Sequence, residues 1–345
     1  MRHATLVVTA LLSTALLLPA QRGERGPRRD QAPPLQHFTI ETGTIQSTKV
    51  RDGEAGYEIY LPKGHGDEAN KDKTWPFVVW LSGFGGNGEF TNRGGAQVLD
   101  QMRADGKVPE FALVVYRAPS GQGGRRGRSV YMNGEAAADT EDLLCGDFLE
   151  QLQKKYRLAA DRKQRALMGV SAGGFGALKI AMRHPDVFGA VAVHSAAILP
   201  ADPGELAGNA EGIVQRMLRG GLEKELGNPI DAAKWRAHMP MALAADKKPE
   251  DLKGLQMYFD AGTADAYDFC PPNEQLAKVM AEKGHKHLFR KIDGGGHAWS
   301  SESMAENLAV SLQFVGLAFA GKDAVAELTP KAEAKKDAAA PATGK

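Results

Sequence analysis

One serine lies in a sequence context that could make it a nucleophile. Ser171 is the centre of Gly169-Val170-Ser171-Ala172-Gly173, which matches the Gly-x-Ser-x-Gly pattern of a sharp strand-to-helix turn. Glycines suit the outer positions because larger side chains would clash with the adjacent strand and helix. An apolar run at 166–170 precedes the turn and an amphipathic stretch at 173–184 follows it. The context that the pattern requires is therefore present, and we predict Ser171 as the nucleophile.

A serine nucleophile needs a base, because its free hydroxyl hardly ionises at neutral pH. The chain has nine histidines, and His297 has the most suggestive setting, in Asp293-Gly-Gly-Gly-His297-Ala-Trp299. We expect this segment to be a loop between a strand and the last long helix, where glycines let the backbone bring the ring over the edge of a sheet. We predict His297 as the base and expect the other histidines to be structural or on the surface.

The imidazole in turn needs a carboxylate that fixes its tautomer and stabilises its charged form. Three acids compete in the segment after the apolar run at 255–259: Asp260, Asp265 and Asp268. We favour Asp265, on the turn after Gly262, and expect Asp260 to brace the loop, with Asp268 third. The order Ser171, Asp265, His297 is then the order of α/β hydrolases.

Backbone amides should stabilise the oxyanion. One candidate is the amide of Ala172, directly after the nucleophile, and the other is the amide of Phe84, in the glycine-rich loop after the apolar run at 77–81. Phe84 and Trp299 are also predicted to line the substrate pocket. Residues 83–88 match Gly-x-Gly-x-x-Gly, the fingerprint of dinucleotide-binding sites, so a dinucleotide-dependent oxidoreductase is an alternative. No acid follows the next apolar run, where that motif expects one. The triad mechanism needs neither a metal nor an organic cofactor, and we predict none.

Short apolar runs alternate with amphipathic stretches along the chain. This alternation predicts an α/β-hydrolase fold, with a mostly parallel central sheet and helices on both faces. Residues 200–252 interrupt the rhythm and are expected to form a helical insertion or lid. Predicted strands are at 57–61, 77–81, 111–116, 166–170, 188–193 and 255–259, and predicted helices at 140–156, 173–184, 274–283 and 303–319.

The two ends of the chain differ in composition from its middle. Residues 1–20 have a basic start and an apolar stretch, which is typical of a signal peptide, and residues 21–36 are rich in Arg, Pro and Gln, typical of a disordered linker. Residues 321–345 contain almost no large apolar side chain and are predicted to be a disordered tail. We expect one catalytic domain at 37–320, in a protein exported to the periplasm or secreted.

The overall charge balance indicates that nucleic acid is not a partner. The formal net charge of +1 gives no basic footprint for nucleic acid. After signal cleavage no remaining segment is apolar enough for a stable membrane span. Cys145 and Cys270 could form at most one disulfide, and the sequence does not tell whether they are close enough.

Several of these segments together resemble a known group. The phrases are Trp80-Leu-Ser-Gly-Phe-Gly-Gly-Asn87, Gly169-Val-Ser-Ala-Gly-Gly-Phe-Gly-Ala-Leu178, His184-Pro-Asp-Val-Phe188, Asp260-Ala-Gly-Thr-Ala-Asp265 and Gly295-Gly-His-Ala-Trp299. Over about residues 40–320 the chain looks like the esterase D family of α/β hydrolases. That family includes S-formylglutathione hydrolases, feruloyl and acetylxylan esterases, enterochelin-esterase-like proteins and mycolyltransferases.

The resemblance implies the same triad and the same two oxyanion amides. One departure is Ser82-Gly83 where the family usually has His-Gly, which matters little because the hole uses backbone amides. The predicted function is hydrolysis of a small-molecule or polymer-borne carboxylic ester. Acyl transfer by the same triad and a non-catalytic binding role are the alternatives. The basic loop at 121–128 could contact an anionic substrate or be a solvated loop.

Overall fold

The structure is a computed structural model that describes residues 34–84, 86–119, 129–218, 221–297 and 302–330. Eight strands of this part form one sheet in the order β1-β2-β4-β3-β5-β6-β7-β8. β1 pairs antiparallel with β2, and β2 with β4, while every other neighbouring pair is parallel. The strands are β1 (Phe38–Gln46), β2 (Glu54–Pro62), β3 (Phe77–Leu81), β4 (Ala112–Arg117), β5 (Arg165–Val170), β6 (Ala190–His194), β7 (Gln256–Gly262) and β8 (His287–Ile292). The predicted fold class, an α/β-hydrolase fold with a mostly parallel sheet, is confirmed.

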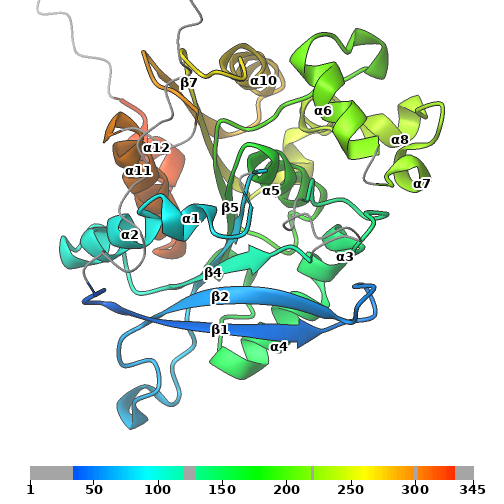
Figure 1. Ribbon diagram of the computed structural model, residues 1–345. Coiled ribbons are helices and arrows are strands. Elements are labelled where there is room, and N and C mark those ends of the chain that lie inside the picture. The colour runs from blue at the N-terminus through cyan, green and yellow to red at the C-terminus, as the bar shows by residue number, and fades with distance from the viewer. Residues whose placement is uncertain (1–33, 85, 120–128, 219–220, 298–301, 331–345) are drawn as a thin grey trace, which may run out of the picture.

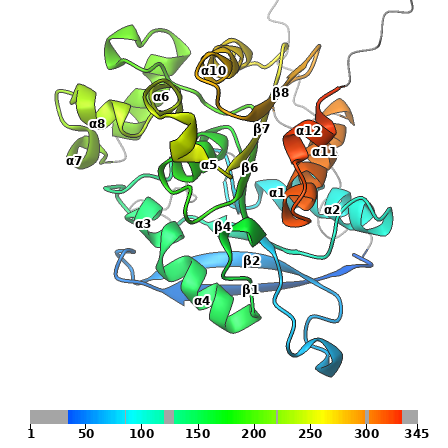
Figure 2. The ribbon, with the colours of Figure 1, turned by 180° about the vertical axis from the view of Figure 1, so that it is seen from behind.

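Helices cover both faces of this sheet (Figures 1 and 2). On one face lie α2 (Gly95–Ala104), α11 (Glu302–Phe319) and α12 (Ala324–Leu328). On the other lie α3 (Thr140–Cys145), α4 (Asp147–Tyr156), α5 (Ala172–Arg183), α9 (Pro240–Asp246) and α10 (Cys270–Glu282). The short α1 (Glu89–Asn92) follows β3 and leads into α2.

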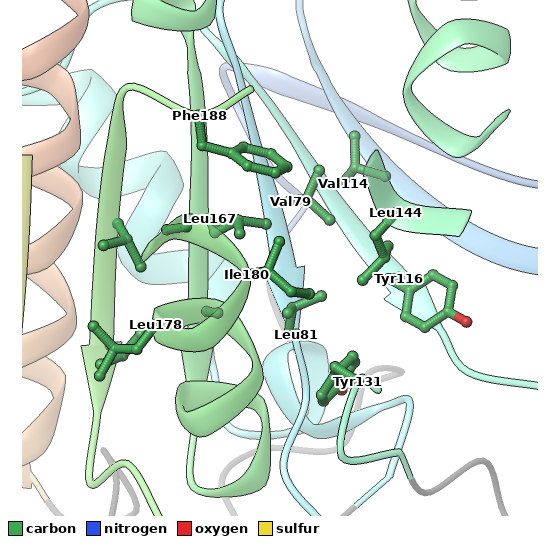
Figure 3. Packing of buried hydrophobic residues seen from close by; sticks show 14 of the residues in the cluster. Val79, Leu81, Val114, Tyr116, Tyr131, Leu144, Leu167, Leu178, Ile180 and Phe188 are labelled. Atoms are coloured by element: carbon green, nitrogen blue, oxygen red, sulfur yellow. The ribbon is translucent and has the colours of Figure 1, made fainter. Parts of the chain in front are cut away.

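The central strands are apolar at every position because both of their faces are covered. In β3, Val79 and Leu81 pack in the cluster under α5, whereas Val78 and Trp80 pack in the cluster under α2 and α11. Figure 3 shows the first cluster, where Ile180 of α5 lies over the strands. Burying each such side chain contributes about 1.5–3 kcal/mol. The continuous apolar runs therefore correspond to strands with no solvated face.

The predicted insertion at 200–252 lies between β6 and β7 and is helical. Its core is a separate apolar cluster that includes Ile213, Met217 and Trp235. The elements are η4 (Pro203–Glu205), α6 (Asn209–Leu218), α7 (Glu223–Leu226), α8 (Ala232–Arg236), α9 and η5 (Pro249–Leu252); η2 (Glu68–Asn70) and η3 (Arg162–Gln164) lie elsewhere in the chain.

Several features differ from the sequence predictions, among them α2, which was not predicted. β1 was not predicted, because as an antiparallel edge strand it buries only Phe38 and Ile45 and shows no apolar run. The single helix predicted at 140–156 is broken into α3 and α4 at Gly146, whose backbone (φ −122°, ψ −106°) is not helical. The tail predicted to be disordered from residue 321 begins with α12, in which Ala324 and Val325 are buried against the sheet.

Further predictions concern the two ends of the chain, the cysteines and membrane spans. The signal peptide, residues 21–33 of the linker and residues 331–345 of the tail lie outside the described residues. Cys145 and Cys270 are both free thiols, so the disulfide left open by the sequence is not formed. Within the described part of the chain, no helix has the length and apolar character needed to cross a membrane.

Candidate active site

Ser171 stands at the sharp turn between β5 and α5, with a positive φ (φ 57°, ψ −119°) that is rare for a non-glycine residue. Its amide donates to the carbonyl of His194 at 2.9 Å, and its own carbonyl accepts from the amides of Phe175 and Ala197 at 3.0 and 3.1 Å. These bonds to α5 and to the end of β6 hold the strained turn in place.

The glycines around Ser171 are required by close backbone contacts. A Cβ on Gly173 would lie 2.0 Å from the carbonyl oxygen of Leu81, and one on Gly169 would lie 2.6 Å from the carbonyl oxygen of Gly173. Both partners are backbone atoms and cannot rotate away. The sequence pattern therefore reflects how tightly β3, β5 and α5 pack at this point.

Asp265 and His297 come together from two loops at the carboxyl edge of the sheet. Asp265 follows β7 and His297 follows β8, and these strands are parallel neighbours. Nδ1 of His297 is 2.9 Å from Oδ2 of Asp265, whose side chain is fully buried. The other carboxylate oxygen accepts the amide of Tyr267 at 2.8 Å. The carboxylate is thus fixed, and it favours the tautomer with the proton on Nδ1.

The ring of His297 and the side chain of Ser171 face a common cavity of about 280 Å³. The ring centroid of His297 is 4.6 Å from that of Tyr267 and 5.6 Å from that of Phe269, so two aromatic rings fix its orientation. The cavity wall is largely apolar and comes from several elements: Val130, Phe175, Ala197, Leu199, Ile213, Met217 and Phe269. The cavity lies beside the nucleophile turn and is bounded by α6 of the insertion.

The two other candidate acids lie elsewhere. Asp260 is buried in β7, where its carboxylate is 2.9 Å from Nδ1 of His194 and accepts the hydroxyl of Tyr258 at 2.7 Å. Nε2 of His194 is 2.9 Å from Oγ of Ser311, so a second serine–histidine–aspartate chain lies in the core. All of its side chains are inaccessible to solvent, and a substrate could not reach it. Asp268 is exposed and lines a neighbouring cavity.

The two candidate oxyanion amides belong to the start of α5 and to the loop after β3. Ala172 is the first residue of α5, so its N–H has no acceptor within the helix. Phe84 lines the same cavity from the loop after β3. A buried carboxylate holds this loop, because Oε2 of Glu89 accepts the amide of Gly83 at 2.7 Å. Glu89 also pairs with Arg93 at 3.1 Å.

A buried polar network supports the loop from below. The hydroxyl of Tyr131 donates to the carbonyl of Ser82 at 2.6 Å, and burial raises the pKa of this phenol well above its usual range. Nζ of Lys179, on α5, donates to the carbonyl of Tyr131 at 2.5 Å and to Oε2 of Glu141 at 2.6 Å. Burial opposes ionisation of Glu141, but Lys179 and its other cationic neighbours outweigh burial and hold the pKa of that carboxyl far below its usual value.

The remaining sequence predictions are placed as follows. Trp299 and Gly85 lie outside the described residues. The loop at 83–88 holds the Glu89 carboxylate against the amide of Gly83, where a dinucleotide site would need to receive a pyrophosphate. That carboxylate would repel the ligand. Among the described residues no group of three or more His, Cys, Asp or Glu side chains could hold a metal ion.

Sequence reasoning found Phe84 in the cavity wall but missed most of the other side chains that shape it. Glu89, Arg93 and Arg216 carry no motif, and their positions depend on how α1 and α6 pack around the loop after β3. Among the missed residues, Tyr267 could most easily have been predicted from sequence, because it lies two residues after Asp265 in the same loop. The hydrogen bond from its backbone N–H to that carboxylate is a local consequence of the turn.

Comparison with known proteins identifies the family. The family model described as "Putative esterase" matches residues 48–312, which include Ser171, Asp265 and His297. The chain belongs to this esterase family. It is a carboxylic ester hydrolase, and the resemblance to the esterase D group of α/β hydrolases is confirmed.

One characterised relative shares part of the sequence. Our chain is 27% identical over 172 residues to an endo-1,4-beta-xylanase/feruloyl esterase of Xylanibacter ruminicola. The matched region is 47% of this chain but only 23% of that relative, so the chain spans about a quarter of the curated protein.

Solved structures agree on the fold. A ferulic acid esterase has 26% identity and a TM-score of 0.63, with 82% of this chain and 99% of that chain covered. The S-formylglutathione hydrolase of Agrobacterium tumefaciens has 18% identity and a TM-score of 0.58, over 81% and 98% of the two chains. FphF, a fluorophosphonate-binding serine hydrolase of Staphylococcus aureus, has 15% identity and a TM-score of 0.61, over 80% and 99%. At these last two identities the likeness concerns the fold alone.

Proposed function

We propose that this esterase cleaves its substrate through an acyl-enzyme on Ser171, with His297 as the base and Asp265 as the acid that orients it. One observation carries the proposal. His297 is held at 2.9 Å by a fully buried carboxylate, while its ring shares a cavity with a serine on a strained strand-to-helix turn. A nucleophile, a base and a group that orients the base are the elements of such catalysis.

The reaction would proceed in two halves. Oγ of Ser171 attacks the ester carbonyl while Nε2 of His297 accepts its proton, and the positive imidazolium is stabilised by Asp265. The amides of Phe84 and Ala172 donate to the oxyanion, where each donor typically contributes about 100- to 1,000-fold in turnover. The C–O bond to the alcohol then breaks, and His297 returns the proton to the leaving oxygen. Water deprotonated by His297 attacks the acyl group and releases the acid.

The cavity favours esters with an apolar acyl group, including aromatic ones. Phe84, Phe175 and Phe269 line the cavity together with aliphatic side chains from the insertion. Two relatives with the names feruloyl esterase and ferulic acid esterase support hydroxycinnamoyl esters as substrates to test first. We further propose that residues 200–252 act as the lid over this cavity, since α6 contributes Ile213, Arg216 and Met217 to its wall.

We also propose that the esterase is exported, on the basis of the basic and apolar residues at 1–20. Fractionation of cells that express the full chain tests this. Mature protein with a shortened N-terminus outside the cytoplasm is the expected result, and full-length protein in the cytoplasm would contradict it.

The catalytic proposal is tested with 4-nitrophenyl esters from acetyl to octanoyl and with methyl ferulate. Ser171→Ala should lower kcat by at least about a thousandfold while the thermal unfolding curve stays that of a folded protein. Ser311→Ala is the matched control, because it removes the serine of the buried serine–histidine–aspartate set formed by Ser311, His194 and Asp260. It should retain kcat within about tenfold. Equal activity in Ser171→Ala and the wild type would overturn the proposal.

A further inference from the structure

The wall of the active-site cavity contains charged side chains that ester hydrolysis does not require. They are Glu89, Arg93 and Arg216. Arg93 and Glu89 form an ion pair at 3.1 Å, and Glu89 also accepts the amide of Gly83. The charges of these two side chains therefore balance each other within the protein.

Arg216 differs from Arg93 in its partners. It lies in the last turn of α6, and its guanidinium carbon is 5.8 Å from the ring centroid of Phe84. Across the residues that the structure describes, Arg216 pairs with no carboxylate, so the ring of Phe84 is its described partner. The guanidinium thus adds one positive charge to the cavity wall that no described acid compensates.

The position of this charge relates it to the reacting atoms. Phe84 carries the guanidinium over its ring, and its backbone amide is one of the two proposed oxyanion donors. The side chain of Phe84 thus separates the guanidinium from the proposed oxyanion donor. A group bound by Arg216 would lie about that far from the scissile carbonyl. The wall of the same cavity also contains the apolar side chains of Ile213 and Met217 from the same helix. A ligand that matches this surface has an ester, a short apolar spacer and an anion.

Guanidinium suits such an anion, because its planar donors match the oxygens of a carboxylate or phosphate in a bidentate arrangement. The aromatic ring under it restricts its position, so less rotamer freedom is lost when the anion binds. Arg216 is exposed, so its attraction for an anion acts partly through solvent and should weaken as salt is added.

We propose that Arg216 makes this esterase selective for esters that carry a second, anionic group a few bonds from the scissile carbonyl. This proposal rests on the proposed function, since it places the ester carbonyl at Ser171. The competing explanation is structural: Arg216 packs on Phe84 and stabilises the loop after β3. That explanation predicts equal effects on charged and neutral esters.

Two pairs of esters that differ in one charge test the proposal. Mono-4-nitrophenyl glutarate and 4-nitrophenyl pentanoate differ on the acyl side, and 4-acetoxybenzoate and its methyl ester differ on the alcohol side. Arg216→Gln should lower kcat/KM about tenfold for the charged member of one pair and less than twofold for its neutral partner, as loss of a charged hydrogen bond would. The pair that responds identifies the side of the ester that carries the anion.

Three controls accompany this measurement. Arg216→Lys keeps the charge and should retain part of the preference. Arg236→Gln removes an exposed arginine of the insertion that pairs with Asp246 and does not line the cavity, and it should change neither ester. Raising the ionic strength from about 0.05 to about 0.5 M should reduce the preference of the wild type, because exposed charges are screened.

The outcomes separate this proposal from the proposed function. If Arg216→Gln and Arg216→Lys change charged and neutral esters equally in both pairs, Arg216 only packs on Phe84; the proposal is then wrong and the esterase mechanism stands. If the folded wild type hydrolyses neither pair, the proposed function fails and the role of Arg216 fails with it.

Discussion

Replacing Asp265 with asparagine should lower kcat by about 10⁴-fold, and the structure gives the reason. One carboxylate oxygen accepts the amide of Tyr267 at 2.8 Å and the other is 2.9 Å from Nδ1 of His297. In the asparagine variant the side-chain oxygen would keep the bond to Tyr267, so the NH₂ group would face Nδ1. Nδ1 must then accept, and the proton moves to Nε2, where the proton of Ser171 has to be received.

The magnitude follows from burial. The side chain of Asp265 is fully buried, so water cannot replace the lost acceptor. A 10⁴-fold loss corresponds to about 5.4 kcal/mol of activation free energy, at about 1.36 kcal/mol per tenfold. The assay is kcat for 4-nitrophenyl acetate at saturating substrate, together with a thermal unfolding curve.

Asp260→Asn is the matched control, because it makes the same change in the second buried histidine–aspartate pair. It should lower the thermal midpoint but keep kcat within about tenfold of the wild type. The reasoning would be refuted if Asp265→Asn kept kcat within tenfold, or if a folded Asp260→Asn lost as much activity as Asp265→Asn.

Three further predictions concern stability. Gly173→Ala places a Cβ 2.0 Å from the carbonyl oxygen of Leu81 and should cost about 3 kcal/mol or more in urea unfolding, whereas Gly212→Ala, where a Cβ has open space, should not destabilise; equal midpoints would contradict this. Glu141→Gln leaves the fully buried ammonium of Lys179 without its carboxylate and should cost about 3–5 kcal/mol, most of which the double variant with Lys179→Met should recover. Burial lowers the pKa of His287, so protonation below about pH 6.5 favours the unfolded state; His287→Gln should lose less thermal stability than the wild type between about pH 7 and 5, and parallel curves would refute this.

Much of the fold was predictable because its central strands are covered on both faces. The run at 77–81 coincides with β3, since no position of that strand is left to solvent. β1 was not predictable in this way, because an edge strand with a mostly exposed surface needs no apolar residues. The break at Gly146 and the packing of α12 depend on neighbouring elements, which local sequence does not reveal.

Some residues of the site were also predictable from local sequence, and others were not. Ser171 has a local signature because close backbone contacts demand glycines on either side. Asp260 lies within β7 and Asp265 follows that strand, and sequence could rank them only by their expected position on the turn. Their different roles depend on which histidine each meets, His297 or His194, and both of those partners lie far away in the chain. Arg216 depends on the path of the insertion and has no sequence signature.

The central claim is that Ser171 carries the acyl group during ester hydrolysis. It is tested most directly by rapid acid quenching of the wild type with 4-nitrophenyl butanoate, followed by mass spectrometry of the intact protein and of its peptides. We predict a butanoyl adduct confined to the peptide that contains Ser171, formed as fast as the burst of 4-nitrophenol and absent from Ser171→Ala. Continued turnover with no adduct on that peptide, or with the adduct on another residue, would contradict the account.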